Sequence, residues 1–154
     1  MIVSVSNFLT LLPEYYLAAA KVLGSPGAYQ YGTHMAGDQP QPLLLIIEEA
    51  TAASGEADQQ ILSGKAQIQL FRMEKHTERV GGNLVETEVG VTDWHPVSYG
   101  ITPVIEGTEV KEYTLIVVAK SRIIKHFTDA VTAIMGNPST RISDYPGPDK
   151  GAEV

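Results

Sequence analysis

The one cluster of residues in this chain that resembles a reactive site is Asp93-Trp94-His95. A histidine that is oriented by a neighbouring carboxylate can act as a general base. A catalytic site also needs a nucleophile, a cofactor or a charge-stabilising group at the same point, and the sequence places none beside this triplet. We therefore favour a structural role, in which Trp94 anchors a strand end against the core while Asp93 and His95 flank it at a turn before Pro96.

Other chemical motifs are missing from the sequence. Gly64-Lys65 lacks the upstream glycine spacing of a phosphate-binding loop. His126 and Asp129 form only one helical pair, whereas zinc ligation requires three or four convergent groups. Glu48 and Glu49 are adjacent on a predicted strand and so face opposite ways. We predict that the protein is not an enzyme and has neither a cofactor nor a metal site.

Composition limits the partners of this chain. Its 154 residues are most simply one domain, and 44% hydrophobic with 19% charged residues is typical of a globular protein. A net charge of −7 with scattered basic residues argues against nucleic-acid binding. The absence of cysteine excludes disulfides and thiolate metal sites. No apolar run approaches the ~20 residues of a membrane-spanning helix, so we expect no membrane partner.

The clearest structural pattern lies at residues 110–137. A β-branched run from Tyr113 to Ala119 predicts a buried strand that leads directly into a helix. Ser121 is the predicted N-cap, and Gly136-Asn137-Pro138 is a stop signal. The apolar stripe of this helix comprises Ile123, Ile124, Phe127, Val131 and Ile134.

Earlier segments predict a helix, a loop and a strand. Ser6-Asn7 can cap a helix that continues to Leu23, although Pro13 means that the helix either kinks there or begins there. Residues 32–42 are rich in glycine, glutamine and proline, which predicts a surface loop. Leu43–Glu49 reads as an apolar strand in the centre of a sheet.

A long hairpin is predicted over residues 64–92. Gly81-Gly82-Asn83 forms its turn, and its charged residues gather near the tip, so we expect the hairpin to project from the body. Phe71 and Met73 are out of phase with the alternation before them, which indicates a bulge or a change of environment. A separate strand over residues 97–101 is predicted to end at Pro103.

Together these elements predict an α+β fold over residues 1–138. Its mainly antiparallel sheet carries the N-terminal and C-terminal helices on one face, with the long hairpin projecting. Residues 139–154 are predicted to form an extended C-terminal tail. Tyrosines in loop-like segments, basic residues of the hairpin and apolar residues of the tail are typical of interfaces. These candidate interface residues are Tyr29, Tyr31, Arg72, Lys75, Arg79, Ile142 and Tyr145.

The order of elements resembles that of the tail-completion or tail-terminator proteins of long-tailed phages. The resemblance covers about two thirds of the chain: the helix Phe8–Leu23, the loop to Pro42, the strand Leu43–Glu49 and the strand–helix unit Tyr113–Ile134. It implies a ring-forming, commonly hexameric structural protein at the tail–neck junction of the virion, assembled in the host cytoplasm. Its implied partners are other copies of itself and the tail tube, sheath or connector.

Two other functions fit the same sequence. One is a different virion role, as a tail-tube or capsid-decoration subunit. The other is a small enzyme or ligand-binding domain centred on Asp93-Trp94-His95 and Tyr99.

Overall fold

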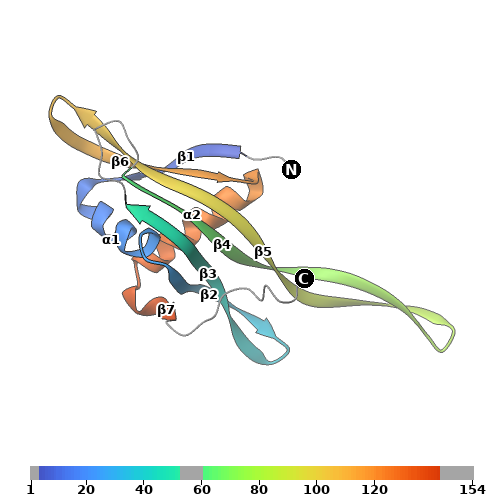
Figure 1. Ribbon diagram of the computed structural model, residues 1–154. Coiled ribbons are helices and arrows are strands. Elements are labelled where there is room, and N and C mark those ends of the chain that lie inside the picture. The colour runs from blue at the N-terminus through green and yellow to red at the C-terminus, as the bar shows by residue number, and fades with distance from the viewer. Residues whose placement is uncertain (1–3, 53–60, 143–154) are drawn as a thin grey trace.

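The computed structural model describes residues 4–52 and 61–142, which form one seven-stranded antiparallel sheet with two helices (Figure 1). The strand order is β1-β6-β5-β4-β3-β2-β7. Both helices pack on the same face of the sheet, so the predicted α+β fold class is confirmed. The elements are β1 (Ser4–Leu11), α1 (Pro13–Leu23), β2 (Gly27–Ala36), β3 (Gln39–Ala52), β4 (Leu62–Val80), β5 (Asn83–Glu106), β6 (Glu109–Ala119), α2 (Ser121–Met135), the 3₁₀ turn η1 (Pro138–Thr140) and β7 (Arg141–Ile142).

The core lies between the sheet and the helices. Strands β2 to β6 follow one another as neighbouring antiparallel strands, and their inward side chains meet the apolar stripe of α2. Phe127 of this stripe is fully buried and stacks on Tyr99 of β5, with ring centroids 5.8 Å apart. The predicted strand–helix unit is therefore confirmed.

The predicted cap of α2 is wrong in detail. Lys120 occupies the N-cap position without a side-chain cap, and Ser121 is the first helical residue. The Ser121 hydroxyl is instead hydrogen-bonded to the hydroxyl of Ser4 in β1. The start of α2 is thereby joined to the edge strand of the sheet.

The prediction that the first helix can begin at Ser6 is wrong, because a strand precedes Pro13. Residues 4–11 form β1, which pairs with β6, and α1 begins at Pro13. The ring of Pro13 fixes φ and removes an N–H, which suits the first turn of a helix and not its interior. The alternative in which the helix truly starts at Pro13 is the one that the structure adopts.

The predicted loop over residues 32–42 is also wrong. These residues form the outer half of the β2–β3 hairpin, which turns at Gly37, where φ is +65°. Pro40 and Pro42 lie within β3 because this part of β3 pairs with β2 alone; pairing with β4 starts only at Leu45. A strand with one neighbour has room for a residue that cannot donate a hydrogen bond.

The same rule explains the prolines of β5. Pro96 lies before the first pair with β6, at Ser98, and Pro103 lies beyond the last pair with β4, at Ile101. Each proline therefore stands where β5 has a single neighbour. For this reason Pro103 does not end the strand, and β5 continues to Glu106.

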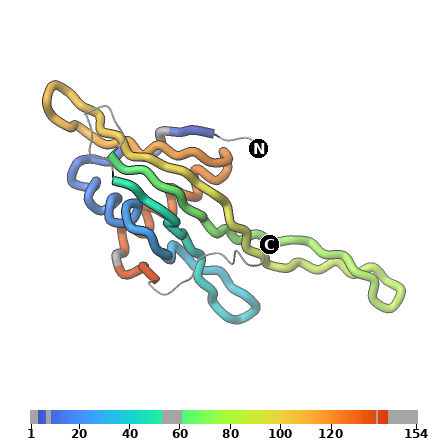
Figure 2. The backbone as a smooth tube through the Cα atoms, in the orientation of Figure 1, coloured from blue at the N-terminus to red at the C-terminus, as the bar shows by residue number. Residues whose placement is uncertain are grey.

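Strands β4 and β5 stay paired beyond the body of the sheet (Figures 1 and 2). Their register is continuous from Leu62 opposite Ile101 to Val80 opposite Asn83, with Gly81-Gly82 at the turn. The expected bulge near Phe71 is absent from this pairing. The out-of-phase pattern there marks a change of environment, because β3 leaves β4 after Ile68. We call the two-stranded part, residues 72–91, the arm.

Close contact between β3, β4 and β5 makes a glycine necessary at position 64. A Cβ atom on Gly64 would lie 2.6 Å from the Glu49 carbonyl oxygen and would also clash with the Tyr99 hydroxyl, whereas a Cβ on Gly32 would meet only Leu43 at 3.9 Å. We expect Gly64→Ala to lower the free energy of unfolding by about 1–3 kcal/mol. Gly32→Ala is the matched control and should leave it unchanged or slightly higher. Equal effects of both variants in urea denaturation would contradict this account of the packing.

Candidate functional site

The arm is the most exposed feature of the described structure. Its two strands extend about 30 Å beyond the body, at about 3.3 Å per residue. The arm lies beyond the body of the protein (Figure 1), and large apolar side chains are exposed along it. These residues are Met73, Val80, Leu84, Val85 and Val89.

Each face of the arm combines apolar and charged side chains. Residues directly opposite in an antiparallel pair share a face, so Glu74 lies beside Val89 and Glu78 beside Val85. This face continues the helix-covered face of the sheet. Charged residues on one strand thus accompany valines on the other, which keeps the arm hydrated while leaving an apolar stripe exposed.

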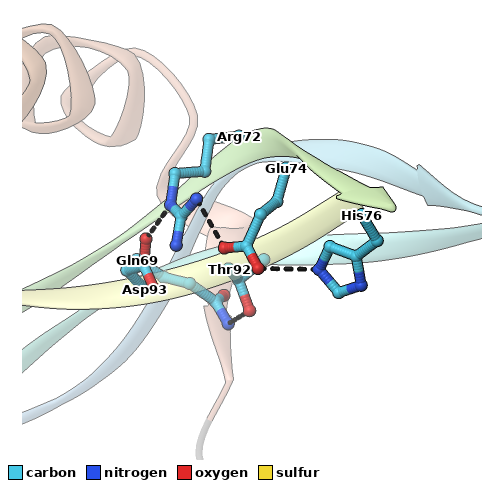
Figure 3. A network of polar contacts seen from close by, with 6 residues as sticks. All are labelled: Gln69, Arg72, Glu74, His76, Thr92 and Asp93. Carbon is cyan, nitrogen blue, oxygen red and sulfur yellow. Dashed lines mark hydrogen bonds and ion pairs between the residues drawn. The ribbon is translucent and has the colours of Figure 1, made fainter. Parts of the chain in front are cut away.

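An ion network holds the base of the arm (Figure 3). Arg72 donates from Nε to the Asp93 carboxylate at 2.5 Å and lies 2.8 Å from the carboxylate of Glu74. His76 lies 2.7 Å from the other oxygen of Glu74. The hydrogen bond from Arg72 lowers the pKa of Asp93, and hydrogen bonds from His76 and then Arg72 lower the pKa of Glu74. Exposed pairs of this kind contribute little stability, so their main effect is to orient the side chains.

Gln69 links the strands at the fork where β3 and β4 separate. Its side chain accepts a hydrogen bond from the Leu44 backbone N–H at 3.2 Å and donates one to Thr92 at 3.3 Å. The backbone carbonyl oxygen of Gln69 accepts a hydrogen bond from the Tyr31 hydroxyl. Gln69 therefore replaces the backbone pairing that ends here. The sequence showed only an alternating polar residue at this position, so its role could not be predicted.

Asp93, Trp94 and His95 lie within β5 and not at a turn as predicted. Asp93 is hydrogen-bonded to Arg72, which lies diagonally across the β4–β5 pair, and is thus committed to the arm network. Trp94 is only partly buried and points to the face opposite the helices, so it does not anchor the strand in the main core.

His95 borders a hollow of about 450 Å³ between β5 and the start of α2, which Lys120 and Ile123 also line. Burial lowers the pKa of His95, and the positive charge of Arg122 lowers it further. The imidazole is therefore neutral at neutral pH and can accept a hydrogen bond or a proton. In the described part of the chain, no three His, Asp or Glu side chains are grouped to hold a metal ion.

The predicted tyrosine interface rested on loop segments that the structure replaces by β2. Tyr29 is buried, donates to the Ser25 carbonyl at 2.8 Å and lies beneath the Arg141 guanidinium. Tyr31 is half-buried, and burial raises its pKa to about 12. Ile142 belongs to β7 and pairs with Ala28. Tyr145 lies outside the described residues.

The basic candidates behave differently from the tyrosines. Arg72 is committed to the ion network, whereas Lys75 and Arg79 are exposed on the outer part of the arm. Two unpredicted features complete the surface: the edge strand β1 and the short strand β7, which covers part of β2. The one local signal for β1 was indirect: Pro13 favours a helix that starts at that position, which leaves the residues before it outside the helix.

Comparisons with known proteins leave the family open. No protein-family model, no curated protein and no solved structure matches this chain. Neither of the described helices is long and apolar enough to cross a membrane.

The environment of His95 predicts a pH-dependent stability. Its pKa in the folded protein lies below 6.5, so the unfolded chain binds more protons as the pH falls through this region. The free energy of unfolding should therefore decrease as the pH is lowered from about 7.5 to about 5. His95→Asn should flatten this slope, while His126→Asn, an exposed control on α2, should preserve most of it. Urea titrations at several pH values measure both slopes, and an unchanged slope in His95→Asn would contradict the prediction.

Proposed function

We propose that this protein is a structural virion component that forms a ring at the tail–neck junction of a long-tailed phage. The observation that carries the proposal is the arm. A two-stranded ribbon without a core is marginally stable in water, and this one exposes apolar side chains over about 30 Å. Such a segment gains most of its stability from a partner, which is the physical signature of an assembly subunit.

The body of the protein supports the same proposal. The strand–helix unit β6–α2 corresponds to one part of the resemblance to tail-terminator proteins, and both helices lie on one face. The edge strand β1 departs from that pattern, because its residues 8–11 lie in the segment for which the resemblance implies a helix. The other face of the sheet and the arm stay available for neighbours.

The length of the arm supports one kind of partner. Its reach exceeds several strand spacings, so a neighbouring subunit or an adjoining tail-tube, sheath or connector protein is the natural acceptor. Its alternating charges keep it hydrated before assembly and discourage unwanted pairing. A tail-tube or capsid-decoration role would use the same mode of assembly.

Shortening the arm tests this function. Replacing residues 75–88 with Asn-Gly leaves the pair of Glu74 and Val89 closed by a two-residue turn. The variant should fold normally, since no core residue is removed. We expect the full chain to form rings in negative stain, with a light-scattering mass several times 16.6 kDa. The shortened chain should dissociate at concentrations at least about tenfold higher than the full chain does.

Two matched variants separate the contributions within the arm. Lys75→Ala with Arg79→Ala removes charge, and Leu84→Ser with Val89→Ser removes apolar surface; we expect the second to weaken assembly more. A full chain that stays monomeric at high concentration would contradict the proposed function. Undiminished assembly of the shortened chain would instead exclude the arm as a subunit contact.

A further inference from the structure

The two edges of the sheet lack the charges and prolines that commonly protect exposed strands. Edge strands usually carry charges or proline, which prevent pairing with other chains. Neither β1, residues 4–11, nor the edge of β2 beyond β7, residues 30–36, contains Asp, Glu, Lys, Arg or Pro. The β4 strand of the arm, by contrast, carries five charged residues over residues 72–80: Arg72, Glu74, Lys75, Glu78 and Arg79.

A groove runs beside the free edge of β2. Its volume is about 450 Å³, and it lies between residues 30–33 of β2 and the end of α2 with η1. Thr140 lines the groove, and its hydroxyl oxygen is buried without a hydrogen-bond partner among the described residues. A buried hydroxyl is more stable with a hydrogen-bond partner, so an extended segment with backbone polar groups would complete this site.

The last described residues of the chain pair with another part of β2. Arg141 lies opposite Tyr29 and Ile142 opposite Ala28, so β7 advances toward Gly27. The free part of β2 lies in the other direction, at residues 30–36. Among the described residues, no strand pairs with this outer edge of β2.

A second copy of the chain has the right direction. Strands alternate in direction across the order β1-β6-β5-β4-β3-β2, so β1 and β2 run opposite to each other. When β1 of one copy is placed beside β2 of the next in the same plane, the pair is antiparallel, and the helices of both copies lie on the same side. The sheet would then continue from copy to copy without a reversal.

We propose that β1 of each copy pairs with the free edge of β2 in its neighbour. This inference rests on the proposed ring-forming function and names the contact that would build the ring. The two surfaces are unlike, so the contact is head-to-tail and can close into a ring. Bulges at Asn7–Leu9 and Gln30–Gly32 limit regular pairing to residues 4–7 against residues 32–36.

Cysteine cross-linking tests the contact directly, because the native chain contains no cysteine. Val5 in β1 and Met35 in β2 are 66% and 56% exposed, so Val5→Cys and Met35→Cys leave the core intact. With a short bis-maleimide, the double variant should give a ladder of covalent multimers. A mixture of the two single variants should give dimers only, and each single variant alone should give none.

The remaining outcomes distinguish failure of the contact from failure of the function. Dimers from Val5→Cys alone would show that β1 pairs with β1 and overturn the inference. Rings without cross-links would overturn the inference while the proposed function stands, and a monomer under all conditions would overturn both. Val5→Lys should weaken association at least tenfold in light scattering. The equally exposed control Leu17→Lys, on α1, should not, and equal weakening by both would also overturn the inference.

Discussion

The continuous pairing of β4 with β5 is the constraint on which the rest of the structure depends. One register, closed by the turn at Gly81-Gly82, runs from the core to the tip of the arm. A slip by one residue would move Ile68 and Val97 from the helix-covered face to the open face. The same pairing therefore determines both the composition of the core and the surface that the arm presents.

The neighbours of this central pair cover only half of it. β3 and β6 flank its inner part, and beyond Ile68 and Ser98 the two strands continue without them. At this boundary side chains replace the missing backbone partners: Gln69 binds the free N–H of Leu44, and Arg72 links the strands through Asp93. The boundary thus separates a body with a conventional core from an arm whose apolar side chains are exposed.

Two of the residues considered as candidates for a reactive site have structural roles. Asp93 is bonded to Arg72, and Tyr99 donates to the Leu23 carbonyl at the end of α1. His95 borders the hollow between β5 and the start of α2. The proposed assembly function would use the surface of the sheet and the arm, and not a cluster of reactive groups.

Sequence by itself determined the elements whose signals are local. The apolar stripe from Ile123 to Ile134 specifies α2, and Gly81-Gly82 specifies the hairpin turn, because periodicity and positive φ are properties of short segments. Tertiary structure alone decided that residues 4–11 pair with β6 as a strand, that β5 continues through Pro103, and that Tyr29 is buried. Each of these depends on which strand lies alongside, and that neighbour comes from a distant part of the chain.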